Sequence, residues 1–217
     1  NRQAEPLEII NPDTACEPPS ISLREISVYR NKNPLTEHLN LEIHPGEIWG
    51  IIGKNGLGKT TLLRTISGLH REYSGDILLN GRRLSQKELR KKAYLVMQDV
   101  NYQLFADSVE AECTLGIQAD TVRVRSALEK MELWEYRDRH PNTLSGGQKQ
   151  RLAVAVSLVC EKEILLFDEP TSGLDYRSMI RMSDLISEMA RMGKYILIVS
   201  HDEEFLAACC TGICQMT

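Results

Sequence analysis

Short apolar runs alternate along this chain with longer stretches in which apolar and polar residues mix. Four runs have the length of a strand that is buried on both faces, and they are Glu47–Ile52, Tyr94–Gln98, Ile164–Phe167 and Tyr195–Ser200. The stretches between them read as helices, so the chain alternates strand and helix. This alternation predicts an α/β protein with a mostly parallel central sheet.

A glycine-rich loop, Gly53-Lys-Asn-Gly-Leu-Gly-Lys-Thr60, follows the first of these runs. Its three glycines let the backbone turn tightly, so that successive N–H groups point into one concavity. The next residues, Thr61–Ser67, read as a helix, and a helix N-terminus favours bound negative charge. The pattern predicts a phosphate-binding loop in which Lys59 neutralises the β- and γ-phosphates and the Thr60 hydroxyl ligates Mg²⁺.

Two adjacent carboxylates, Asp168 and Glu169, emerge where the run Ile164–Phe167 ends. Ligands of open α/β sheets collect at the carboxyl ends of the strands. Asp168 therefore suits Mg²⁺ binding, and Glu169 suits orienting and deprotonating an attacking water molecule. The other interpretation of such a pair is ordinary helix-capping charge.

The pentapeptide Leu144-Ser-Gly-Gly-Gln148 opens a predicted helix that runs to about Cys160. Ser145 can cap this helix, and the two glycines let a phosphate approach the backbone closely. Such a phosphate site has no reason to lie beside the chain's own loop at residues 53–60. A plain capped helix is the alternative interpretation.

A polar or aromatic residue lies at the end of each of three further predicted strands. His201 follows the run Tyr195–Ser200 and could reach a γ-phosphate, although a histidine at a strand end is by itself more often structural. Gln98 ends another run, where turn chemistry is one interpretation. Tyr29 closes the strand that begins at Ile21, where an aromatic can simply pack on the core.

These segments, in this order, resemble the ATP-binding cassettes, a branch of the phosphate-loop ATPases that Leu144–Gln148 marks. The resemblance covers nearly everything from Ile21 to Met216. It implies a phosphate-loop NTPase fold with a mostly parallel sheet core, an antiparallel β subdomain and a small helical lobe. It also implies ATP hydrolysis used as a motor, with ATP and Mg²⁺ as cofactors. In the cassettes the pentapeptide faces the loop of a second cassette, which here would be identical, paralogous or fused.

The resemblance assigns roles to matching residues of this chain. It implies that Gln98 contacts the magnesium or the water, that Tyr29 stacks on adenine, and that Asp175 lies at the tip of a switch loop. The implied catalytic residues are Glu169, His201 and Gln98, and the implied metal ligands are Thr60, Gln98 and Asp168. The implied nucleotide contacts are Tyr29, Gly53, Asn55, Gly56, Gly58, Lys59, Thr60, Thr61, Ser145, Gly146, Gly147 and Gln148.

A narrower resemblance lies after Gln98. Gln103-Leu-Phe105, with Val109 and Gly116, is similar to the ATPase subunits of energy-coupling-factor importers, which take up vitamins, cobalt or nickel. Those subunits usually carry Asn-Pro where Asp99-Val100 stand here. The resemblance implies a transmembrane transporter subunit as partner and a peripheral place on the cytoplasmic face of the cell membrane.

Two functions outside transport stay open. The first is a soluble tandem-cassette ATPase that acts on translation, against which Gln103–Phe105 counts. The second is a clamp that binds ATP without turning it over. Such modules usually lose the carboxylate base or the histidine, whereas Glu169 and His201 are both present.

Charge and composition limit the classes of partner that this chain can have. The formal net charge of −4 gives no basic footprint, so nucleic acid is not expected as the main partner. The apolar runs are far too short to cross a bilayer, and the six cysteines form neither a disulfide framework nor a zinc pattern. Any membrane association would therefore come through a protein partner.

Residues 1–19 differ from the rest of the chain, because they hold half of the prolines together with four acidic residues. We predict an extended linker or tail there and a cassette domain over residues 20–217. Residues 107–135 are helical in pattern, with Val122, Leu128 and Met131 as their apolar positions. They would belong to a helical lobe over about residues 100–155.

Overall fold

The computed structural model describes residues 18–117 and 120–216. The predicted tail lies outside the described residues except for Pro18 and Pro19. Within the described part of the chain, no helix combines the length and the apolar character that spanning a bilayer requires.

A five-stranded sheet forms the centre of the molecule, in the order β6-β7-β8-β3-β9. Every pair of neighbouring strands in it is parallel, as the alternation of strand and helix predicted. The strands are β3 (Ile48–Ile52), β6 (Ala93–Val96), β7 (Ile164–Asp168), β8 (Tyr195–Val199) and β9 (Gly212–Gln215).

Buried apolar residues cover both faces of this sheet, which explains why its central strands read as unbroken apolar runs. Along β7, Leu165 and Phe167 belong to the cluster that fills the space on the side of the helical lobe. The alternate residues, Ile164 and Leu166, belong to a second cluster on the other face. All five residues of β7 are buried.

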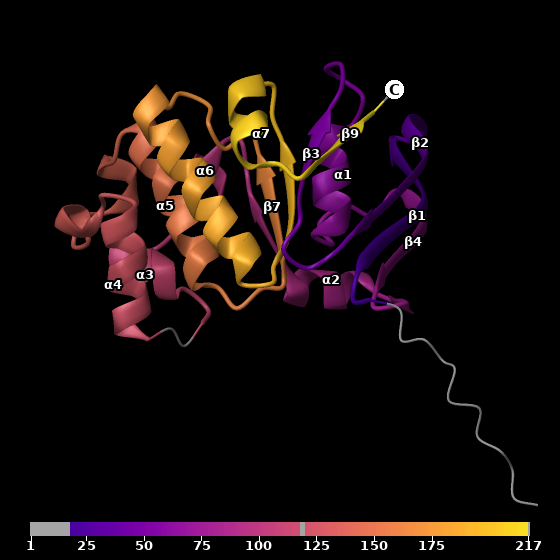
Figure 1. The fold of residues 1–217 in the computed structure, drawn as a ribbon. Coiled ribbons are helices and arrows are strands. Elements are labelled where there is room, and N and C mark those ends of the chain that lie inside the picture. Colours follow the sequence, from indigo (N-terminus) through magenta and orange to yellow (C-terminus); the bar gives the residue numbers. More distant parts are fainter. Residues whose placement is uncertain (1–17, 118–119, 217) are drawn as a thin grey trace, which may run out of the picture.

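An antiparallel sheet of order β2-β1-β4-β5 lies at one end of the molecule (Figure 1). Its strands are β1 (Ile21–Arg30), β2 (Asn33–Ile43), β4 (Tyr73–Leu79) and β5 (Arg82–Arg83). A turn at Asn80-Gly81 joins the last two strands, and both turn residues have positive φ, 51° and 73°. The predicted antiparallel subdomain is thus present.

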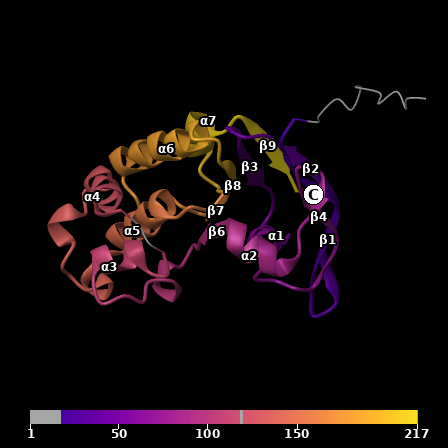
Figure 2. The ribbon, with the colours of Figure 1, turned by 90° about the horizontal axis from the view of Figure 1, so that it is seen from below.

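Seven α-helices are seen in the described residues, and they surround the parallel sheet. Figure 2 shows α6 and α7 on one side of it and α1 and α2 on the other, with α3 and α4 at the end away from the antiparallel sheet. They are α1 (Lys59–Ile66), α2 (Gln86–Lys92), α3 (Val109–Thr114), α4 (Thr121–Lys130), α5 (Gly146–Val159), α6 (Tyr176–Arg191) and α7 (Glu203–Cys209).

The region with helical pattern at residues 107–135 forms α3 and α4 rather than one helix. Gly116 has φ of 73°, and Asp120 caps the second helix by accepting a hydrogen bond from the N–H of Val122 at 3.1 Å. Val122 is 70% exposed, so its assignment to the apolar face was wrong. The buried face consists of Val124, Ala127, Leu128 and Met131 instead, at positions i, i+3, i+4 and i+7.

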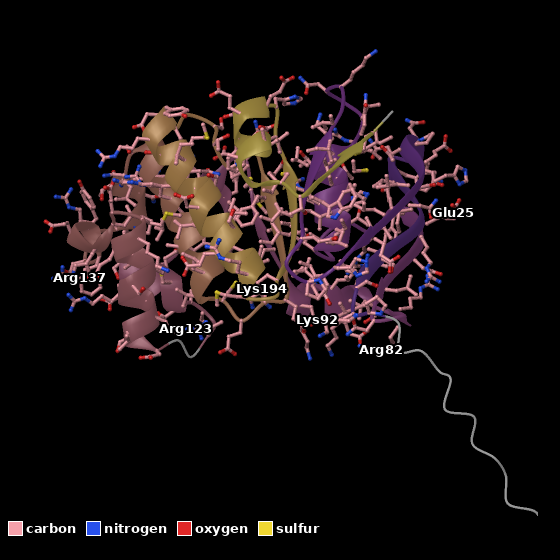
Figure 3. The ribbon with its side chains drawn as sticks, in the orientation of Figure 1. Glu25, Arg82, Lys92, Arg123, Arg137 and Lys194 are labelled. Carbon is pink, nitrogen blue, oxygen red and sulfur yellow. The ribbon has the colours of Figure 1, made fainter. Side chains whose placement is uncertain are left out.

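Charged side chains are spread over the surface, as Figure 3 shows. The labelled Arg82 pairs with Glu88, Lys92 pairs with Glu163, and Arg123 pairs with Glu161. Exposed pairs of this kind stabilise a fold little, about 0–1 kcal/mol each. Their effect here is to neutralise individual basic side chains across the surface.

Candidate nucleotide-binding site

The glycine loop lies between β3 and α1, as predicted, and α1 begins within it at Lys59. Gly56 and Gly58 have φ of 89° and 85°, the left-handed conformation that glycine adopts at little cost. A Cβ atom at Gly58 would also stand 2.8 Å from the Cβ of Leu35. The Lys59 ammonium is buried and donates to the carbonyl oxygens of Gly53 and Lys54, at 2.6 and 3.0 Å.

Asp168 ends β7 with its side chain 3% exposed. Burial raises the pKa of this carboxyl above its ordinary value of 3.8, and a hydrogen bond with Thr60 opposes that rise. Among the described residues, nothing donates a hydrogen bond to its Oδ1 atom. A buried carboxylate oxygen without a donor is costly unless something cationic occupies the space in front of it.

Glu169 follows in the left-handed backbone conformation, with φ of 49°. Non-glycine residues in this region cost about 1–3 kcal/mol, and they cluster at functional sites. Its Oε2 atom accepts hydrogen bonds from the Ser200 hydroxyl and from the N–H of His201, both at 3.3 Å. The His201 Nε2 atom lies 3.6 Å from Oε1. Glu169 is therefore held at the end of β7 by residues at the end of β8.

One cavity of about 540 Å³ brings these elements together. Its walls come from the glycine loop and from the ends of strands, as expected where ligands collect at the carboxyl edge of a parallel sheet. The predicted residues that line it are Asn55, Gly56, Gly58, Lys59, Thr60, Thr61, Gln98, Asp168, Glu169 and His201. The lysine, hydroxyl groups and glycine-loop backbone of this lining are donors that suit phosphate.

The donor set fits a magnesium ion. Mg²⁺ prefers oxygen ligands, and it usually retains several waters beside one or two carboxylates and the phosphates. Asp168 offers a buried oxygen without a donor, and the Thr60 hydroxyl lies against the same carboxylate. Gln98 lines the cavity with both of them. Thr60, Asp168 and Gln98 remain the predicted metal ligands.

Four residues that sequence reasoning did not single out also line the cavity: Arg30, Leu35, Ser172 and Val199. Tyr29 does not line it. Its hydroxyl lies 3.3 Å from the Ser74 hydroxyl of β4, and the next residue, Arg30, reaches the cavity instead. Adenine stacking by Tyr29 stays a prediction that this geometry does not support. The alternation of side chains along a strand could have flagged Arg30.

The pentapeptide does not line this cavity. Ser145 caps α5: its hydroxyl accepts from the N–H of Gln148 at 3.3 Å, and the Gln148 side chain accepts from the N–H of Ser145 at 2.9 Å. A Cβ atom at Gly146 would meet nothing within 4 Å, whereas one at Gly147 would meet Leu174 at 3.4 Å. The space at Gly146 is therefore open to an approaching group, and neither glycine lines the cavity at the chain's own phosphate loop.

Asp168→Asn is expected to raise the melting temperature of the ligand-free protein by about 2–4 °C at pH 7, which corresponds to about 1 kcal/mol. The raised pKa means that folding opposes ionisation of this carboxyl, so the ionised form lowers stability at pH values above the folded pKa. The gain should shrink as the pH falls through the folded pKa and disappear below 3.8, where the carboxyl is protonated in both states. Thermal unfolding from pH 7 to pH 4 checks this, and equal melting temperatures at pH 7 would contradict it.

The fold and the cavity define a phosphate-loop nucleoside triphosphatase: a parallel sheet, a glycine loop opening a helix, and a carboxylate pair at the end of a neighbouring strand. Residues 36–172 also match the family model described as ABC transporter. The chain belongs to this family of ATP-binding domains, which hydrolyse ATP. The predicted fold and family are thereby confirmed.

Relatives in the family carry transporter names. A putative ABC transporter ATP-binding protein of Treponema denticola is 44% identical over 195 residues, which make up 89% of this chain and 40% of that protein. The energy-coupling factor transporter ATP-binding protein EcfA of Methanothermobacter thermautotrophicus is 35% identical over 200 residues, 86% of this chain and 64% of that protein. The chain thus spans about two fifths of the length of the Treponema relative.

Solved structures agree with the fold. The structure of cbiO1 from Clostridium perfringens, described as part of the ABC transporter complex cbiONQ, has a TM-score of 0.79 at 29% identity and covers 93% of this chain and 86% of that one. A bacterial Atm1-family ABC exporter with ATP bound has a TM-score of 0.80 at 26% identity. The match covers 93% of this chain and 38% of the exporter chain. The fold alone therefore does not separate import from export.

Proposed function

We propose that this chain is the ATP-hydrolysing domain that powers a membrane transporter, and that the transporter is an importer of the energy-coupling-factor type. The observation that carries the proposal is the double placement of Gln98. It lines the nucleotide cavity with Glu169, and it also lines a surface groove of about 460 Å³ with Tyr102 and Leu69. The cavity for hydrolysis and a surface groove suited to a partner are therefore adjacent, and Gln98 lines both.

In the proposed mechanism, Lys59 leaves its two carbonyl partners and binds the β- and γ-phosphates. Thr60, Asp168 and Gln98 hold the magnesium ion, which, when bound, neutralises charge on the phosphates. Glu169 orients a water molecule and takes its proton. His201, which lies against Glu169, contacts the γ-phosphate and so distinguishes the states before and after hydrolysis.

A second cassette completes the site. Ser145 and Gly146 are exposed at the start of α5 and, like Gly147, do not line the cavity of their own chain. A helix N-terminus with free N–H groups suits phosphate, so this surface would bind the nucleotide held by another cassette. That cassette would be a second copy, a paralogue or a fused domain.

Mixing two inactive variants is expected to restore hydrolysis if two copies share their sites. Lys59→Met lacks the phosphate ligand, and Gly147→Asp places a negative charge where the partner's phosphate would lie. The aspartate would not weaken α5, because acidic residues stabilise the first turn. In an equimolar mixture, half of the dimers have one intact site, so about a quarter of the parent rate should return. No recovery would exclude sharing between identical copies.

The surface beside Gln98 suits a protein partner. Leu69 and Tyr102, which line the groove with Gln98, are 53% and 74% exposed. Large exposed apolar side chains that gather at one place mark interaction sites, and aromatic residues are enriched there. The similarity to EcfA and to cbiO1 favours an importer, with vitamins or metal ions as the transported substrates. Such a partner would hold the chain at the cytoplasmic face of the membrane.

The two alternatives lack a comparable observation. An ATP clamp without turnover has no need of a carboxylate base, whereas Glu169 is held at the cavity by Ser200 and His201. A soluble ATPase acting on translation has no need of the exposed Leu69 and Tyr102 in the groove that Gln98 lines.

Co-purification of the full-length gene product from membranes, followed by mass spectrometry, tests the proposal. A small multi-helix membrane subunit together with a substrate-binding membrane protein is the expected result. Ribosomes in its place, or no membrane protein at all, would overturn the transport function and leave the ATPase.

A further inference from the structure

A short segment, residues 97–106, connects Gln98 to α3, and side chains from three elements fix it in place; we name it the bracket. Within it, the Gln103 side chain accepts a hydrogen bond from the N–H of Met97 at 2.7 Å. The same amide donates to the Tyr94 hydroxyl of β6 at 3.2 Å. The bracket is therefore folded back on the residue that directly precedes Gln98.

A second attachment comes from α5. The Lys149 ammonium donates to the side-chain oxygen of Asn101 at 2.8 Å. Asp99 in turn accepts from the N–H of Asn101 at 3.1 Å and caps the short 3₁₀ helix Val100–Tyr102. Because Lys149 directly follows Gln148, the bracket is tied to the helix that the pentapeptide opens.

The third attachment is a buried carboxylate. Glu112 lies on α3 with its side chain 4% exposed. Its Oε2 atom accepts from two successive backbone groups, the N–H of Phe105 at 2.8 Å and that of Ala106 at 2.7 Å. Hydrogen bonds to a charged acceptor are about twice as strong as neutral ones, and a buried charge without partners is costly. Glu112 and the backbone of Phe105 therefore hold each other in place.

The bracket presents an aromatic residue from this fixed backbone. Leu104 and Ala106 point inward and are 5% and 8% exposed, whereas Phe105 between them is 71% exposed. A fold that needed only a filled core could pack an apolar residue at position 112. The buried carboxylate instead determines where the two N–H groups around Phe105 lie.

We propose that Glu112 is a positioning residue that couples the nucleotide site to the membrane partner; this inference rests on the proposed transport function. It ties the backbone at Phe105 to α3, while Gln103 ties the same segment to the residue before Gln98, so that the nucleotide site and Phe105 keep a fixed spatial relation. Glu112 does not touch the nucleotide cavity. Its removal therefore leaves basal hydrolysis intact and weakens the hold on the partner.

The test compares four variants of the full-length gene product in its own cells: Glu112→Ala, Glu112→Gln, Phe105→Ala and the control Glu110→Ala on the same helix. Hydrogen exchange of the Phe105–Ala106 peptide should be faster by about tenfold or more in Glu112→Ala. Retention on washed membranes should fall by about tenfold in Glu112→Ala and in Phe105→Ala. Glu112→Gln keeps an acceptor oxygen, so it should retain most of the exchange protection and most of the membrane retention of the parent. The basal rate of ATP hydrolysis should equal that of the parent in all four variants.

Phe105→Ala changes an exposed side chain, so the test survives even if Glu112→Ala fails to fold. Full membrane retention of Phe105→Ala or of Glu112→Ala would overturn the inference and leave the transport function standing. A parent protein absent from the membrane fraction would overturn the transport function and this inference with it. An equal loss of membrane retention in the Glu110→Ala control would also overturn the inference about Glu112, because the effect would then not be specific to that residue.

Discussion

Glu169→Gln is expected to lower the rate of ATP hydrolysis by about 10²–10⁴-fold while ATP binding persists. The substitution removes the group that takes the proton from water but keeps the shape of the side chain. Its amide oxygen can still accept from the Ser200 hydroxyl and from the N–H of His201, which hold the residue at the cavity. Phosphate release and nucleotide binding, measured on the same preparation, check the two expectations.

A variant with bound ATP and no turnover should also accumulate as the closed dimer, which light scattering with and without ATP would detect. Glu204→Gln is the matched control, since Glu204 is exposed on α7 and does not line the cavity. Hydrolysis by Glu169→Gln at the parent rate would show that another group activates the water.

Lys59→Met is expected to weaken ATP binding by about 10–100-fold and to abolish measurable hydrolysis. The loss follows from the removal of charge-assisted hydrogen bonds to phosphate, each worth about 1.5–3 kcal/mol. Methionine retains the apolar stem, so the buried part of the side chain still packs. Titration with a fluorescent ATP analogue gives the affinity.

Lys54→Met tests whether position rather than charge matters. Lys54 belongs to the same loop and carries the same charge, but it is exposed and does not line the cavity. It should bind ATP within about twofold of the parent, since an exposed lysine contributes little. Equal losses in both variants would mean that the loop attracts nucleotide through its general charge.

The sequence predicted the central sheet well because β7 and β8 are buried on both faces. Such strands read as unbroken apolar runs, and polar residues directly after them, such as Glu169 and His201, must then lie at one edge. The glycine loop was predictable for a similar local reason. Its conformation depends on residues that are adjacent in sequence.

Other features depend on tertiary placement and could not be predicted in the same way. Val122 fits an apolar period by spacing, yet it faces solvent in the first turn of α4. Leu35 lies at the cavity because β2 passes against Gly58, a contact between segments far apart in sequence. The choice between Tyr29 and Arg30 depends on which face of β1 meets the cavity.

The alternating packing of β7 has a mechanical consequence for the carboxylates at its end. Leu165 and Phe167 anchor the strand in one cluster, and Ile164 and Leu166 anchor it in the other. Displacing this strand along either face would disturb a close-packed interior, which resists deformation. The two acidic groups are thus held from both faces of the sheet, so their positions are set before any nucleotide binds.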